Sequence, residues 1–116
     1  MEYTKIVYNN CYGGFSLSDS GVRMYLQLKG WKYTEEVSRF SYTNFIVEGV
    51  EGFYDRDIDR ADPCLVEAVE KLGVDANGDY AKLCIANVPK GTLYRITDYD
   101  GLESVETRDA FDWKVA

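Results

Sequence analysis

The chain reads Asn9-Asn10-Cys11-Tyr12-Gly13-Gly14-Phe15-Ser16-Leu17-Ser18-Asp19 where its first strand is expected to pass into its first helix. The residues before this stretch are apolar in succession at Ile6-Val7-Tyr8, which predicts a well-covered strand from Lys5 to Asn9. After it, apolar residues recur with a helical period up to about Lys29, and Ser16 or Ser18 is the expected N-cap. The stretch therefore predicts a strand, a tight loop and an amphipathic helix.

The paired glycines of this loop have two interpretations. Backbone N–H groups at a helix start readily hold anions, so the loop is a candidate ligand site. Gly13-Gly14 lacks the lysine of a P-loop and the spacing of a dinucleotide fingerprint, so a simple tight turn is the alternative. Arg60, beside a second expected helix start, either clamps an anion or pairs with a carboxylate. The candidate ligand-binding residues are Asn10, Cys11, Tyr12, Gly13, Gly14, Phe15, Ser16 and Arg60.

The middle of the chain alternates strands with a second helix. Strands are expected over 31–37 and 43–48, the second through an apolar Phe-Ile-Val run. The clearest local signal follows, because Asp62 is suited to an N-cap, Pro63 to the first helical position and Gly73 to the end of the helix. These residues predict a helix over 63–72.

The C-terminal third predicts three more strands. Tyr80 to Val88 alternates in polarity, and Leu93 to Tyr99 is a further strand. Asp100-Gly101 is typical of a type I′ turn leading into a last strand over 103–108, and the tail 109–116 is expected to fold back onto the body. The expected fold is one α+β domain over residues 1–116, with a mixed or antiparallel sheet, two helices and the order β-α-β-β-α-β-β-β.

Acidic residues outnumber basic ones, 20 to 13, for a formal charge of −7. This balance argues against direct nucleic-acid binding, which needs a basic surface. The acid is concentrated in two runs, 48–62 and 98–112, and the chain also holds 10 tyrosines. The runs are either solvated surface or an acidic, tyrosine-rich surface for a basic partner. The carboxylates assigned to such a surface are Asp55, Asp57, Asp59, Asp98, Asp100, Glu103 and Glu106.

Residue types exclude several kinds of chemistry. The chain has no histidine, which excludes Ser-His-Asp and Cys-His catalysis and histidine-bearing zinc sites. The aspartates from Asp55 to Asp62 do not match a calcium loop, because Arg60 and Val66 stand where glycine and glutamate are required. We expect no catalytic residue, no metal and no cofactor.

Cysteine usage and hydropathy concern the compartment. Cys11, Cys64 and Cys84 have wide spacing and an odd count, which indicates reduced thiols rather than a disulfide framework. Neither a membrane span nor an export signal is expected from the sequence, so the expectation is a cytoplasmic protein.

Several motifs together resemble a family of small proteins from bacteriophage genomes. The resemblance is carried by residues 5–18 (Lys-Ile-Val-Tyr-Asn-Asn-Cys-Tyr-Gly-Gly-Phe-Ser-Leu-Ser), Arg60-Ala61-Asp62-Pro63 with Leu65-Val66, Ala76-Asn77-Gly78, Ala81-Lys82-Leu83 and Tyr99-Asp100-Gly101. Residues 31–55 lie outside it. The resemblance implies a phage origin and action in the cytoplasm of a bacterial host, and it transfers no activity.

Three functions are compatible with these observations. The first is a non-catalytic counter-defence inhibitor that binds a host defence protein, such as a CRISPR effector, through its acidic, tyrosine-rich surface. The second is a sponge that sequesters a nucleotide immune signal with the glycine loop, Arg60 and tyrosines, at the interface of a possible homo-oligomer. The third is a small hydrolase acting on a nucleotide.

Overall fold

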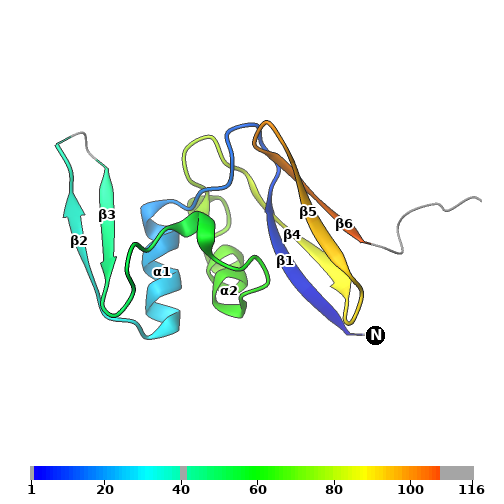
Figure 1. Cartoon of the computed structure of the whole chain (residues 1–116), viewed down its shortest axis with the longest axis horizontal. Coiled ribbons are helices and arrows are strands. Elements are labelled where there is room, and N and C mark those ends of the chain that lie inside the picture. The colour runs from blue at the N-terminus through cyan, green and yellow to red at the C-terminus, as the bar shows by residue number, and fades with distance from the viewer. Residues whose placement is uncertain (1, 40–41, 108–116) are drawn as a thin grey trace, which may run out of the picture.

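The computed structural model describes residues 2–39 and 42–107 and has the expected α+β architecture (Figure 1). The helices and strands follow one another in the predicted order. Their bounds are β1 (Tyr3–Asn9), α1 (Asp19–Lys29), β2 (Tyr33–Val37), β3 (Thr43–Val47), α2 (Pro63–Leu72), β4 (Leu83–Pro89), β5 (Tyr94–Tyr99) and β6 (Leu102–Thr107). Short 3-10 turns lie at Asp55–Asp57 and Gly73–Ala76. The expected fold-back of residues 109–116 lies outside the described residues.

The strands form three separate antiparallel pairs. β1 pairs with β4, β2 with β3 and β5 with β6. Figure 1 shows the β1–β4 pair between the two helices and the β5–β6 hairpin, while the β2–β3 hairpin lies beyond α1. The second edge of β1 takes part in other contacts: the Val7 N–H donates to the Arg60 carbonyl at 2.9 Å, and the Asn9 N–H donates to the Glu103 carboxylate at 2.8 Å. β1 is thus held on both edges.

Local capping explains both helices. The Ser18 hydroxyl accepts from the Gly21 N–H at 3.0 Å, and Gly30 ends α1 in the left-handed conformation with φ of 72°. Asp62 caps α2 by accepting from the Cys64 N–H at 2.9 Å, with Pro63 at the first helical position. The predicted N-cap of the second helix is confirmed, and of the two candidates for the first helix the structure selects Ser18.

The main core lies between the helices and one face of the β1–β4 pair. Val7 of β1, Leu26 of α1, and Leu65 and Ala68 of α2 are all completely buried in it. Because side chains alternate across a strand, Ile6 lies on the face of β1 opposite to Val7, and it is also completely buried. β1 is therefore covered on both faces, as its continuous apolar run predicts.

The fourth strand begins later than its alternation predicts. It starts at Leu83 rather than Tyr80 because the chain turns at residues 78–81, where the Ala81 N–H donates to the Gly78 carbonyl at 3.1 Å. Tyr80 has a positive φ of 62°, which is incompatible with a strand. Polar alternation cannot detect such a change in backbone direction.

Asp62 also joins the two helices. Its carboxylate accepts from the Tyr25 hydroxyl at 2.9 Å and forms an ion pair with Lys29 at 2.8 Å, and both partners belong to α1. Partial burial tends to raise the pKa of Asp62, but the hydrogen bonds from Lys29, the Cys64 N–H and Tyr25 outweigh it and hold the pKa below its ordinary value. Burial, together with the bond to Asp62, raises the pKa of the Tyr25 hydroxyl. Within residues 2–39 and 42–107, neither helix has the length and apolarity needed to cross a bilayer.

We predict that Asp62→Ala lowers the free energy of unfolding by about 1–3 kcal/mol at neutral pH, because a cap and two further contacts are lost. The folded pKa of Asp62 lies below the unfolded value of about 4, so this stabilisation is complete above about pH 4 and disappears as the pH falls through the folded pKa. Urea unfolding measured over a pH series should show that the difference in free energy of unfolding between the wild type and the variant becomes smaller below about pH 4. The exposed Glu51→Ala variant is the control. A difference in free energy of unfolding that stays constant with pH contradicts the prediction.

Candidate functional site

The predicted glycine loop is a packed joint between three distant segments. A Cβ atom on Gly13 would lie 2.1 Å from the Tyr80 Cβ, and one on Gly78 would lie 2.0 Å from the Ser16 hydroxyl oxygen. A Cβ on Gly101 would lie 2.5 Å from the Tyr12 carbonyl oxygen. Real Cβ atoms do not tolerate such distances, so these glycines permit close backbone approach. The turn interpretation of the loop therefore accounts for its glycines.

Groups around the start of α1 already have partners in the chain. The Leu17 N–H donates to the Asp55 carboxylate at 2.8 Å, and the Ser18 N–H donates to the Ala76 carbonyl at 2.9 Å. A cavity of about 420 Å³ lies beside this helix start, and its described lining contains Asp19 and Asp79 but neither lysine nor arginine. Carboxylates at a helix start repel an anion, so this cavity does not favour a phosphate.

Arg60 is paired with Glu103 in the interior. Its guanidinium donates to both carboxylate oxygens of Glu103, at 2.5 and 3.0 Å, and lies 3.6 Å from the centre of the Phe15 ring. The side chains of Arg60 and Glu103 are only 15% and 6% exposed. Of the two roles considered for Arg60, the structure shows carboxylate pairing.

The assignment of Glu103 to an exposed acidic surface is wrong, because its side chain is buried. It is buried because β6 places it against β1, where its Oε1 atom also accepts from the Asn9 N–H. Asn9, itself completely buried, donates through its side chain to the carbonyls of Cys11 and Gly101 and accepts from the Lys82 N–H. We define Asn9, Arg60 and Glu103 as the buried polar cluster. It holds the glycine loop, the β5–β6 turn and the segment before α2 together.

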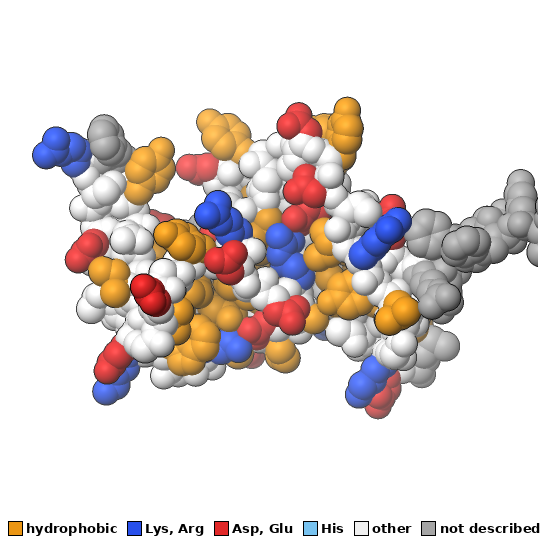
Figure 2. Space-filling view, in the orientation of Figure 1, with side chains coloured by type: hydrophobic (Ala, Val, Ile, Leu, Met, Phe, Trp, Pro, Cys, Tyr) orange, Lys and Arg blue, Asp and Glu red, His pale blue; other side chains and the backbone are white. Residues whose placement is uncertain are grey.

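The joint brings three exposed tyrosines to one end of the molecule. Tyr12, Tyr80 and Tyr99 are 63%, 82% and 75% exposed, and the close contacts of Gly13 and Gly101 bring their segments side by side. The exposed carboxylates of these segments are Asp79, Asp98 and Asp100. We define these six residues as the Tyr–Asp end. Figure 2 shows hydrophobic and acidic side chains projecting together at the upper edge of the molecule, over these loops.

Two backbone features fix this end. Tyr80 has φ of 62° although it is a large aromatic residue, a conformation that costs about 1–3 kcal/mol and persists only where its surroundings impose it. Here Gly13 packs directly against its Cβ atom and backbone. Asp100 and Gly101 have φ of 53° and 91°, as the predicted type I′ turn requires, and Asp98 accepts from the Gly101 N–H at 2.8 Å. The loops that carry the tyrosines are thus structurally constrained.

The remaining predicted carboxylates lie elsewhere and differ in their contacts. Asp55 binds the Leu17 and Arg56 N–H groups, and Asp59 binds the Ala61 N–H. Glu106 pairs with Arg95 across the β5–β6 hairpin. Asp57 has neither a side-chain hydrogen bond nor an ion pair within the described part of the chain. The exposed carboxylates of the predicted acidic surface therefore lie in two regions, the segment before α2 and the β5–β6 hairpin.

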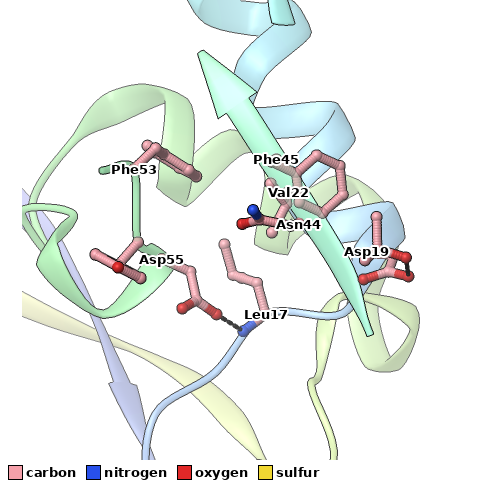
Figure 3. Close-up of a pocket in the computed structure, with 9 residues that line it drawn as sticks. Leu17, Asp19, Val22, Asn44, Phe45, Phe53 and Asp55 are labelled. Carbon is pink, nitrogen blue, oxygen red and sulfur yellow. Dashed lines mark hydrogen bonds between the residues drawn. The ribbon is translucent and has the colours of Figure 1, made fainter. Parts of the chain in front are cut away.

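A small cavity of about 160 Å³ lies between β3, α1 and the segment before α2 (Figure 3). Figure 3 shows Leu17, Val22 and Phe45 on its apolar side, with the Asp55 carboxylate directed at the Leu17 backbone. This bond ties the segment before α2 to Leu17, the residue that precedes the N-cap of α1.

Residues 2–39 and 42–107 contain all three cysteines and most of the carboxylates of the chain. No group of three or more Cys, Asp or Glu side chains there could hold a metal ion. Cys11, Cys64 and Cys84 are partly buried free thiols. Sequence reasoning missed Asp79, Tyr80 and Tyr99 as site residues. The alternation of 80–88 assigned Tyr80 to a strand, and Tyr99 was assigned only to the end of another. The turn compositions of Gly78-Asp79 and Asp100-Gly101 were the available signals.

Comparison with known proteins finds no matching family model, no curated protein and no solved structure similar to this chain. Function must therefore be argued from the site itself.

We predict that Glu103→Ala destabilises the fold by about 3–5 kcal/mol, because it leaves the Arg60 charge buried without its partner. Glu106→Ala, which breaks the exposed pair with Arg95, should change the free energy of unfolding by about 1 kcal/mol or less. Chemical denaturation measures both values. Glu103→Gln keeps an acceptor for Asn9 and should fall between them, so the comparison remains informative if Glu103→Ala does not fold. Equal effects of the two alanine variants would contradict a structural role for the buried pair.

We also predict that Gly13→Ala destabilises the protein by about 1–3 kcal/mol or more, because the new methyl group meets both the Tyr80 Cβ and its carbonyl oxygen at 2.2 Å. Asn10→Ala, three positions before Gly13 at an exposed side chain, is the matched control and should stay within about 0.5 kcal/mol. Thermal unfolding of the two variants tests the joint. A tolerated Gly13→Ala would show that the loop is not tightly packed.

Proposed function

We propose that this chain is a non-catalytic binding protein that engages a basic protein surface through its Tyr–Asp end. One observation carries the proposal: three tyrosines from distant segments lie exposed among carboxylates, on loops that pack against one another through close glycine contacts. Nothing in the packing of the described residues requires an aromatic side chain at Tyr80, which is 82% exposed in a strained backbone conformation.

The physical properties of tyrosine support this role. Tyrosine has few rotatable bonds, offers a large amphipathic contact area and is enriched at the energetic centres of protein interfaces. Loops held in one conformation lose little entropy on binding, which favours affinity. The surrounding carboxylates and the net charge of −7 accelerate association with a basic partner and repel nucleic acid.

The nucleotide alternatives receive less support. A sponge or a hydrolase needs a cation at the glycine loop, and the guanidinium of Arg60 is already held by Glu103 in the interior. Releasing Arg60 for a phosphate would leave the Glu103 charge buried and unpaired.

The finer proposal concerns the partner. The resemblance to small bacteriophage proteins directs the search to bacterial host proteins, and defence proteins that handle nucleic acid have the basic surfaces that an acidic tyrosine-rich end would bind. We therefore propose that the chain is a counter-defence inhibitor acting in the host cytoplasm, with a CRISPR effector as one example of its target.

The test combines partner isolation with paired tyrosine variants. A host protein recovered with the immobilised chain in stoichiometric amount is purified, and its affinity is measured for the wild type, for Tyr12→Ala/Tyr99→Ala and for the control Tyr3→Ala/Tyr94→Ala. The control tyrosines are 54% and 39% exposed, and they begin β1 and β5, at the strand ends opposite to Asn9 and Tyr99. We expect the first pair to weaken binding by at least about tenfold, the control by less than about threefold, and affinity to fall with salt.

Several outcomes contradict the proposal: failure to recover a stoichiometric protein, equal losses in both pairs, or affinity independent of salt. A thermal-shift screen with cyclic and linear nucleotides adds an independent arm. Stabilisation by a nucleotide recovered intact would replace the proposal with the sponge, and recovery of an altered nucleotide would replace it with the hydrolase.

A further inference from the structure

An aromatic cavity lies at the C-terminal end of α1, beside the segment that leads into α2. Its volume is about 300 Å³. We define the aromatic pocket by its four rings and three carboxylates, Tyr25, Trp31, Phe53, Tyr54, Asp57, Asp59 and Asp62. It shares no residue with the Tyr–Asp end.

The rings of the aromatic pocket support one another. Tyr25 stacks on Phe53 with ring centres 6.2 Å apart, and it meets Trp31 edge to face at 6.1 Å. Tyr25 is buried, whereas Trp31 and Tyr54 are 39% and 54% exposed. The pocket therefore has a packed aromatic wall and aromatic rings that remain accessible to a ligand.

A cation of the chain already uses this wall. The Lys29 ammonium lies 5.4 Å from the centre of Trp31 and 5.6 Å from that of Tyr25, and it pairs with Asp62. At the rim, the Arg56 guanidinium lies 5.2 Å from the centre of the Tyr54 ring without lining the cavity. Both contacts show that these rings accept positive charge, and beside the two cations of the chain Trp31 and Tyr54 keep exposed surface for a further one.

Three carboxylates of the aromatic pocket stand against two cations of the chain, Lys29 in the lining and Arg56 at the rim, so the net charge there is negative. Asp62 is neutralised by Lys29, but Asp59 binds only the neutral Ala61 N–H, and Asp57 has no polar side-chain partner in the described chain. An apolar ligand would desolvate these carboxylates without compensation, and an anion would be repelled. A cation satisfies the rings and the carboxylates together.

We infer that the aromatic pocket binds an arginine side chain of a partner protein. Arginine fits better than lysine because its planar guanidinium stacks on aromatic faces and presents several N–H donors to carboxylates at once. The inference does not rest on the proposed function, because the pocket and the Tyr–Asp end are separate sites and either can be active alone.

The probe is the blocked tripeptide acetyl-Gly-Arg-Gly-amide, titrated into the full chain. Binding is followed by the NMR signal of the Trp31 indole N–H, which is assigned by its disappearance in Trp31→Phe. We expect a saturable shift. The control is the same peptide with arginine replaced by citrulline, a nearly isosteric but neutral side chain. Because the charge attraction is lost, the citrulline peptide should bind with at least about fivefold lower affinity.

Two charge variants test whether the arginine peptide binds at the aromatic pocket. Asp57→Asn/Asp59→Asn removes the uncompensated charges of the pocket while keeping an acceptor for the Ala61 N–H, and it should weaken binding at least about fivefold. Asp98→Asn/Asp100→Asn removes the same number of charges at the Tyr–Asp end and should leave the affinity nearly unchanged. Their amide spectra verify that both variants fold.

Three results would overturn the inference. They are citrulline binding as tightly as arginine, equal losses in the two charge variants, and a lysine tripeptide binding at least as tightly as the arginine one. The affinity loss in Tyr12→Ala/Tyr99→Ala belongs to the proposed function alone, so failure of one idea is distinguishable from failure of the other.

Discussion

The buried ion pair between Glu103 and Arg60 is the interaction on which the arrangement of this structure depends. The Glu103 carboxylate accepts hydrogen bonds from the guanidinium of Arg60 and from the backbone of Asn9, and so connects β6, the segment before α2 and the end of β1. A carboxylate with 6% exposure is stable only when its charge and its oxygen atoms are satisfied. Because the partners come from three distant segments, the pair requires the whole fold to be in place.

This constraint determines which groups are available for function. Arg60 and Glu103, which the sequence offers as a ligand clamp and as surface acid, are committed to the interior. The glycine loop is committed as well, because it must accept Gly101 and Tyr80 at close range. What remains outside is aromatic and acidic, at the Tyr–Asp end and at the aromatic pocket. Both surfaces are suited to a basic protein partner, for different physical reasons: solvent-exposed rings at one, a partly enclosed cavity at the other.

Local signals predicted the elements of the fold well. Asp62-Pro63 and Gly73 defined the second helix, a serine capped the first, and Asp100-Gly101 formed the expected turn, since each depends on a few adjacent residues. Non-local signals were harder. The alternation that extended the fourth strand to Tyr80 gave no sign of the turn at residues 78–81, where Tyr80 packs against Gly13 from a distant part of the chain. Trp31 was assigned to a strand over 31–37, and no local pattern indicated that Trp31 and Phe53 would both pack against Tyr25.

The sequence by itself determined the α+β class, the order of strands and helices, the caps and the acidic character, because period, propensity and charge are properties of short segments. Only the tertiary structure decided that Glu103 is the buried carboxylate, that Arg60 pairs with it, and which tyrosines lie together at one end. Those outcomes depend on distances between residues such as Asn9 and Glu103 that are remote in the chain. The energy of a charge is set by its surroundings after folding, and no local pattern specifies those surroundings.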